Sequence, residues 1–312
     1  MSDSWTVLRL LTWTTDYLKS RGSENPRLDA EVLLAHARNC ERIALYTAFD
    51  QIVADDVRAA FRDLVKRRAE GVPVAYLVGK KEFYSLSLRV TPDVLIPRPE
   101  TEFVVVAALD ALGAKSSKFK AQSSEFEETS HSPALNLEPG TLNFVADVGT
   151  GSGAIAIAIA KHAPHCRLVA IDLSPAALAV AKENAAAHQV ADQIQFLEGD
   201  LLAPLPAEPQ FAVIASNPPY VSEPEYAVLN PSVREHEPRQ ALVGGLLGTE
   251  IIERLIPQAA ERLLPGGWLI LELSPMIAAR TVELLASDGR FDPAIIAKDL
   301  AGLARVIKAR RK

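Results

Sequence analysis

An amide side chain followed by two prolines and a tyrosine is the stretch of this chain best suited to chemistry. It reads Asn217-Pro218-Pro219-Tyr220 and follows an apolar run, residues 211–215. Proline has no N–H and restricts the residue before it, so the stretch is stiff and offers carbonyl oxygens. One oxygen of Asn217 and one of Pro218 could accept both hydrogens of a planar –NH2 group, while Tyr220 flanks whatever carries that group.

This arrangement suits methyl transfer to nitrogen. An amide or aromatic amine is a poor nucleophile because its lone pair is delocalised. Holding the nitrogen near and in line with a sulfonium methyl group supplies most of the rate. A strong general base is not required, because the methylated nitrogen becomes acidic and loses its proton afterwards. A proline-rich turn without chemistry would show the same residues, but the glycine loop described next favours the chemical interpretation.

A glycine-rich loop, "DVGTGSGAIAIAIA" at residues 147–160, lies where a buried strand is expected to turn into a helix. Its glycines allow a tight turn and direct contact between ligand and backbone. Nineteen residues past the last of them, Asp172 ends the next strand, where a carboxylate can accept hydrogen bonds from both hydroxyls of a ribose. The pattern predicts a nucleoside cofactor without saying which, since the dinucleotide fingerprint also fits. The expected cofactor-binding residues of this part are Gly149, Thr150, Gly151, Ser152, Gly153 and Asp172.

A second acidic turn follows the third strand. Asp200 there could meet the exocyclic amine of an adenine, with Leu201 packing on the base. This signal is weak by itself, since an exposed acidic loop would look the same.

Short apolar strands alternate with helices from residue 142 onward, which predicts a mostly parallel sheet with helices on both faces. Two short closing strands could add an antiparallel edge. Asn217, the glycine loop and Asp172 then share one carboxyl edge, where open sheets bind ligands. The expected strands are 142–148, 168–171, 194–197, 211–215, 268–273, 294–298 and 305–309, and the expected helices are 154–162, 176–188, 249–264 (disturbed at Pro257) and 278–286.

The remainder of the chain predicts three further parts. Residues 1–75 show helical periodicity and predict a small helical domain, in which Asn25-Pro26 supplies an N-cap and a first-turn proline. Residues 76–112 predict a β-hairpin and a linker helix. Residues 113–141 are rich in Ser, Lys and Glu, and predict a flexible insert. Residues 142–312 form the expected catalytic domain.

Composition excludes several classes of protein. The chain has 312 residues and a formal net charge of -6, which argues against a protein that grips long nucleic acid. Two cysteines favour a reducing compartment. We read no signal peptide and no membrane-spanning run, so we expect a soluble cytoplasmic protein, a monomer, with no stable nucleic-acid binding. His162, His165 and Cys166 could supply three metal ligands, but the sequence shows no fourth ligand near them, and we expect no metal.

These motifs together resemble class I S-adenosylmethionine-dependent amino-methyltransferases, which have a Rossmann-like sheet. Three stretches narrow the resemblance to the peptide chain release factor glutamine methyltransferase family (PrmC/HemK). They are "PVAYLVGKKEFYSLSLRVTPDVLIPRPETE" (73–102), "REHEPRQALVGGLLGTEII" (234–252) and "KDLAGLARVIKARR" (298–311). The resemblance covers the whole chain except 113–141.

The resemblance implies a substrate, a cofactor and several site residues. The family methylates the glutamine side-chain amide of the Gly-Gly-Gln tripeptide in class I release factors, with S-adenosyl-L-methionine as methyl donor. It implies that Asn217 to Tyr220 grip the glutamine, that Asn217 also borders the cofactor, and that Arg98 and Glu100 line the site. It further implies that the helical domain docks the release factor.

This chain departs from the family pattern at three places, one of which is the 113–141 insert, which is longer than the family's usual connection. It reads Leu273-Ser274-Pro275-Met276 where the family commonly has a glycine and then a glutamine, and Ala304 where an aspartate is usual. Three alternatives stay open: methylation of a nucleic-acid base amine, methylation of a ribosomal-protein glutamine, and a non-catalytic binding module.

Overall fold

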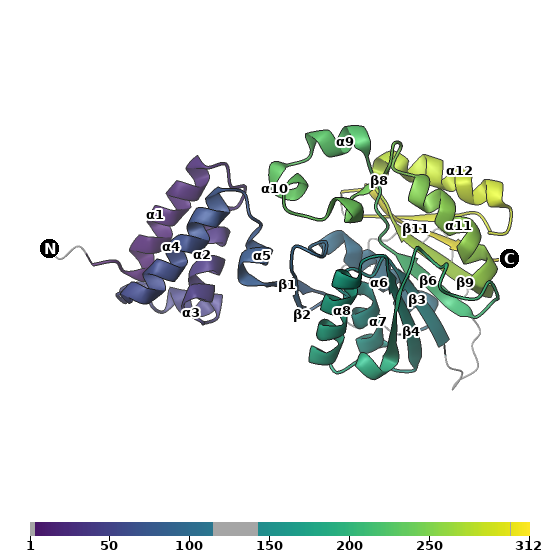
Figure 1. The fold of residues 1–312 in the computed structure, drawn as a ribbon, viewed down its shortest axis with the longest axis horizontal. Coiled ribbons are helices and arrows are strands. Elements are labelled where there is room, and N and C mark those ends of the chain that lie inside the picture. Colours follow the sequence, from purple (N-terminus) through teal and green to yellow (C-terminus); the bar gives the residue numbers. More distant parts are fainter. Residues whose placement is uncertain (1–3, 115–142, 300) are drawn as a thin grey trace. The chain divides into compact units, whose positions relative to one another are not determined.

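The chain forms two compact units in the computed structural model, which describes residues 4–114, 143–299 and 301–312 (Figure 1). One unit comprises Met1–Lys80 with Asn230–His236, and the other comprises Lys81–Leu229 with Glu237–Lys312. The predicted insert at 113–141 lies, from residue 115 onward, outside the described residues.

The first unit is helical. Its core is built from leucines that recur at helical spacing, such as Leu11, Leu18 and Leu33, each with no exposed surface. Thr6 caps the first helix by accepting a hydrogen bond from the Arg9 amide at 3.3 Å. The helices are α1 (Val7–Ser20), α2 (Pro26–Ala37), α3 (Arg42–Tyr46), α4 (Asp55–Ala69), α5 (Val74–Val78) and α10 (Pro231–Arg234).

Two details of this unit differ from the sequence prediction. Asn25 occupies the N-cap position of α2, but its side chain makes no capping bond; Pro26 in the first turn does start the helix, as expected. The second difference is α10, whose segment belongs to the helical unit although it lies far along the chain. Asn230, which precedes it, donates to the Glu24 carboxylate at 3.1 Å.

The second unit begins with a β-hairpin and the segment that leads into the sheet. The predicted hairpin is confirmed as β1 (Lys80–Phe83) paired with β2 (Leu86–Arg89). A short 3-10 turn, η1 (Pro99–Thr101), then leads into α6 (Glu102–Ala111).

Seven strands form the central sheet, in the order β10-β11-β9-β6-β3-β4-β5. The five strands from β9 to β5 run parallel, and β11 and β10 add the expected antiparallel edge. The strands are β3 (Asn143–Val148), β4 (Cys166–Asp172), β5 (Ile194–Glu198), β6 (Phe211–Ser216), β9 (Leu263–Glu272), β10 (Ile295–Lys298) and β11 (Ala304–Arg310).

Helices cover both faces of this sheet (Figure 1). Successive residues of β3 point to opposite faces of the sheet: Val145 packs with α6 and α7, whereas Ala146 packs with α11 and α12. These helices, with α8, are α7 (Ala154–His162), α8 (Pro175–Ala187), α11 (Glu250–Arg262) and α12 (Ala278–Asp288). Helix α11 continues through Pro257, so the predicted disturbance there does not end the helix.

The segment between β6 and α11 contains elements that periodicity did not reveal. They are short, which is why an 11- to 18-residue pattern misses them. They are β7 (Val221–Ser222), α9 (Glu223–Val228) and β8 (Val243–Gly245), and β7 pairs with β8 in a two-stranded parallel sheet. No helix among the described residues is long and apolar enough to span a membrane.

Candidate active site

The glycine loop and Asn217 follow adjacent strands of the sheet. Val148, the last residue of β3, lies opposite Ser216, the last residue of β6. A Cβ built on Gly149 would lie 4.0 Å from the Asn217 carbonyl oxygen. The strand order reverses between β3 and β6, which is the place where open α/β sheets bind ligands.

The loop itself adopts the predicted glycine conformation. The φ angles of Gly149, Gly151 and Gly153 are +72°, +55° and +83°, a region that other residues rarely enter. A Cβ on Gly151 would meet no heavy atom within 4 Å, so this part of the loop is open to a ligand. A Cβ on Gly153 would lie 2.8 Å from Ile157 Cδ1, so this glycine serves packing.

Asp172 stands beside the loop at the end of β4. Its Oδ2 accepts from the Gly151 amide at 2.8 Å, and its Oδ1 accepts from the Ser174 amide at 2.9 Å. Burial raises the pKa of this carboxyl, and the backbone hydrogen bonds partly oppose that rise. The carboxylate is therefore held by the backbone at a position next to the open loop; its role as a ribose acceptor stays a prediction.

Asp147 and two loop residues form the base of the site. Thr150 Oγ1 donates to Asp147 Oδ2 at 2.6 Å, so this hydroxyl is engaged below the loop. Ser152 is buried, and its carbonyl accepts from Asn184 Nδ2 of α8 at 2.9 Å. Asp147 Oδ1 is buried and has no hydrogen-bond partner among the residues that the structure describes, and burial raises the pKa of this carboxyl to about 6. A cationic amino group of a ligand would satisfy that oxygen.

Asp200 and Leu201, the two residues expected beside an adenine, follow the end of β5. Asp200, two residues past β5, forms an ion pair with Arg254 of α11 and is about half exposed. Leu201 adopts a left-handed φ of +53° and packs against the sheet core below it. The sequence did not indicate that Asp200 pairs with Arg254, because the two residues are 54 positions apart.

The Asn217 side chain lies in a hydrogen-bonded chain. Asn217 Nδ2 donates to Thr101 Oγ1 at 3.1 Å, and Thr101 Oγ1 donates to Glu272 Oε2 at 2.6 Å. Tyr220 OH donates to Glu272 Oε1 at 3.1 Å. Glu272 ends β9 and is 2% exposed, and burial raises the pKa of its carboxyl to about 7. Sequence reasoning missed Thr101 and Glu272; the one available signal was a carboxylate at the end of an apolar strand.

Two glycines support the backbone of the Asn-Pro-Pro-Tyr stretch from behind. A Cβ on Gly244 would lie 2.4 Å from the Pro219 carbonyl oxygen, and one on Gly248 would lie 2.4 Å from the Tyr220 carbonyl oxygen. Only a residue without a side chain permits this approach. The "LVGGLLG" stretch therefore holds the loop that carries Asn217.

Arg98 and Glu100 occupy different surroundings. Arg98 forms an ion pair with Glu237, whose carboxylate is buried and also accepts from the Ile96 amide at 3.1 Å. The Glu100 charge contributes to the raised pKa of Glu272. Arg98 is thus tied to a structural partner, whereas Glu100 lies close enough to the Asn217 hydrogen-bonded chain to affect its charge.

Solved structures place the fold among methyltransferases. The catalytic domain of human METTL16, solved with a MAT2A 3′UTR hairpin, is 16% identical with a TM-score of 0.54, covering 79% of this chain and 81% of that chain. The Thermus thermophilus 16S rRNA N2 G1207 methyltransferase, solved with AdoMet and guanosine, is 18% identical with a TM-score of 0.50, covering 75% of this chain and 50% of that one. The predicted class I methyltransferase fold is confirmed.

Sequence relatives identify the family. The PrmC N-terminal domain model matches residues 9–79, and the methyltransferase small domain model matches residues 130–239. A release factor glutamine methyltransferase of Rhodopirellula baltica is 48% identical over 98% of this chain and 97% of that protein. One of Geobacter sulfurreducens is 39% identical over 98% and 97%. The chain belongs to the release factor glutamine methyltransferase family, as its motifs predicted.

Proposed function

We propose that this protein transfers a methyl group from S-adenosyl-L-methionine to the side-chain amide nitrogen of the glutamine in the Gly-Gly-Gln motif of class I peptide chain release factors, and so supports translation termination. The observation that carries the proposal is the fixed side chain of Asn217 beside an open glycine loop. Family membership supports the protein-glutamine substrate over a nucleic-acid base.

The residues of the site fit this cofactor. The open backbone at Gly151 allows close approach, and the Asp172 carboxylate beside it would accept from ribose hydroxyls. The unpaired oxygen of Asp147 suits a cationic amino group. Leu201 would supply apolar surface for the adenine base, and Asp200 would accept from its exocyclic amine. When bound, S-adenosyl-L-methionine would supply an electrophilic methyl group on a sulfonium.

Asn217 and Pro218 would hold the substrate nitrogen. The Asn217 Oδ1 and Pro218 carbonyl oxygens would accept hydrogen bonds from the two N–H groups of the substrate amide, which would leave its nitrogen free to face the methyl donor. Position and alignment then supply most of the rate. The new C–N bond would replace the methyl–sulfur bond, whose electron pair would remain with the sulfur of S-adenosyl-L-methionine. The methylated nitrogen, now acidic, releases one proton to solvent.

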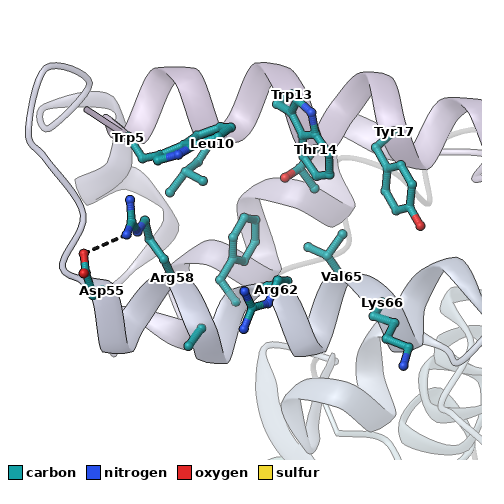
Figure 2. Close-up of a pocket in the computed structure, with 12 residues that line it drawn as sticks. Trp5, Leu10, Trp13, Thr14, Tyr17, Asp55, Arg58, Arg62, Val65 and Lys66 are labelled. Carbon is teal, nitrogen blue, oxygen red and sulfur yellow. Dashed lines mark hydrogen bonds and ion pairs between the residues drawn. The ribbon is translucent and has the colours of Figure 1, made fainter. Parts of the chain in front are cut away.

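We further propose that the helical unit docks the release factor. A groove of about 490 Å³ lies between α1 and α4 of this unit, lined by aromatic and basic side chains (Figure 2). Trp13 is 52% exposed and stacks on Tyr17 with ring centroids 5.2 Å apart. Within the described part of the chain, the Arg62 and Lys66 side chains form no ion pair. An amphipathic acidic segment of the release factor would complement both the rings and the cations.

Kinetics can test this docking surface. A double charge reversal, Arg62→Glu with Lys66→Glu, should raise KM for the intact release factor at least tenfold with kcat unchanged. Methylation of a short Gly-Gly-Gln peptide should not change, since the peptide lacks the docking segment. Lys182→Glu on α8, an exposed lysine of the other unit, is the matched control. An unchanged KM in the double variant would refute docking at this groove.

A cytoplasmic location accords with this substrate, because release factors act on cytoplasmic ribosomes. Cys40 and Cys166 are both free thiols.

A direct assay tests the proposed function. The protein is incubated with methyl-labelled S-adenosyl-L-methionine and a release factor made without its modification. Parallel reactions contain the same factor with its Gly-Gly-Gln glutamine changed to alanine, a ribosomal-protein mixture, or unmethylated nucleic acid. Label should enter only the intact factor and vanish with Asn217→Ala. Gln195→Ala, an exposed amide on β5, should retain full activity. Label in ribosomal protein or nucleic acid instead would reassign the substrate.

A further inference from the structure

The hydrogen-bonded chain behind Asn217 decides which way the amide of Asn217 faces. Its members come from three separate segments: Thr101 from η1, Asn217 and Tyr220 from the loop after β6, and Glu272 from the end of β9. Thr101 and Glu272 are 4% and 2% exposed, so solvent does not compete for these bonds.

When Glu272 is ionised, counting the protons along this chain leaves one arrangement. An ionised carboxylate only accepts, so the single proton of the Thr101 hydroxyl points to Glu272 Oε2, 2.6 Å away. Thr101 Oγ1 can then only accept from Asn217, at 3.1 Å. The –NH2 group of Asn217 must therefore face Thr101, and its Oδ1 must face the opposite way. The second carboxylate oxygen accepts from Tyr220 OH and restrains that ring.

We propose that Glu272 is a positioning residue, which acts through Thr101 to direct the Asn217 side-chain oxygen toward the substrate amide and which restrains Tyr220 beside it. The proposal deepens the proposed function and rests on it. A flipped Asn217 would present –NH2 to the –NH2 of the substrate, and two donors cannot pair. Glu272 thus decides whether the site accepts an amide nitrogen without touching the substrate itself.

The charge state of Glu272 controls this arrangement. Burial raises the pKa of its carboxyl to about 7, and Glu100 adds to the rise, while the bonds from Thr101 and Tyr220 and the Arg305 charge oppose it. A protonated Glu272 can donate to Thr101, whose own proton is then free to point at Asn217. That reversal removes the constraint on the amide. Methyl transfer is therefore expected to decline as the pH falls through about 7.

The isosteric variant Glu272→Gln separates positioning from stability. It mimics the protonated acid, and it removes a buried charge, so the folded protein should be at least as stable as wild type at pH 8. We expect kcat at pH 8 to fall 10- to 100-fold, the decline below pH 7 to disappear, and the Kd of S-adenosyl-L-methionine to stay within twofold. Thr101→Val should lower kcat similarly, and Thr101→Ser should restore it, because serine keeps the hydroxyl.

A spectroscopic readout keeps the test independent of the substrate. The side-chain amide signal of Asn217 is assigned in ¹⁵N-labelled protein by its absence in Asn217→Ala. It should exchange slowly with solvent in wild type at pH 8, and at least tenfold faster in Glu272→Gln and in Thr101→Val. Unchanged exchange together with a wild-type kcat and pH profile in Glu272→Gln would overturn the proposal. If wild type fails to methylate the release factor, the proposed function fails, and the exchange rates alone decide whether Glu272 orients Asn217.

Discussion

Alanine at two glycines of the same loop should have different effects: at Gly151 it should mainly weaken cofactor binding, and at Gly153 it should mainly destabilise the folded protein. Gly151 and Gly153 both have positive φ, so alanine at either position costs about 1–2 kcal/mol of unfolding free energy. At Gly151 that is the whole cost, since the new Cβ meets no heavy atom within 4 Å. The Gly151 amide still donates to Asp172, because only a side-chain atom is added.

At Gly153 the added Cβ has no space. It would lie 2.8 Å from Ile157 Cδ1 and 3.2 Å from Ala181 Cβ, inside the closely packed contact between loop, α7 and α8. Overpacking of this kind costs about 1–3 kcal/mol. Gly153→Ala should therefore lose about 2–5 kcal/mol in total when the backbone strain is included.

Gly151→Ala, the more stable of the two variants, should nevertheless lose affinity for the cofactor. The Cβ of Gly151→Ala occupies space where the proposed cofactor approaches the backbone, so its Kd should rise at least about tenfold, or about 1.4 kcal/mol. Urea unfolding followed by circular dichroism gives the stabilities, and titration calorimetry with S-adenosyl-L-methionine gives the affinities. Wild-type affinity in a folded Gly151→Ala protein, or a Gly151→Ala protein less stable than Gly153→Ala, would refute the reasoning.

Three further predictions concern charged groups. Because burial raises the folded-state pKa of Glu272 to about 7, above its ordinary value of 4.5, the folded protein binds the proton more tightly than the unfolded chain. Glu272 should thus lower the free energy of unfolding by up to about 3 kcal/mol as pH rises from about 4.5 to 7. Urea titrations should show a decrease that is smaller by this amount in Glu272→Gln than in wild type. Asp172→Asn keeps the shape but removes the charge, so calorimetry should show a Kd for S-adenosyl-L-methionine about 10- to 100-fold higher, and an unchanged Kd would contradict a role for this carboxylate. In the helical unit, Arg68 pairs with Asp29 at 2.7 Å, and both side chains are largely buried. Arg68→Met should therefore destabilise the protein by about 3 kcal/mol, measured by urea unfolding followed by tryptophan fluorescence. A loss of less than about 1 kcal/mol would count against a stabilising role for this pair.

Local pattern in the sequence determined the architecture of the sheet and the main features of the site. Apolar runs of strand length alternating with helical periodicity predict a parallel sheet, and the parallel strands then end at one edge. Gly149 to Gly153, Asp172 and Asn217 could therefore be assigned to that edge from their positions at the ends of apolar runs. The glycines were informative because positive φ and close approach depend on the residue itself.

Tertiary structure alone decided how these residues are held. Thr101 and Glu272 are 171 positions apart and Arg98 and Glu237 are 139 apart, and no periodicity relates such pairs. It also decided that the Asp200 carboxylate pairs with Arg254 and that residues 230–236 belong to the helical unit. The physical reason is that periodicity reports which side of an element is buried, whereas the partner of a buried polar group depends on which distant segment packs beside it.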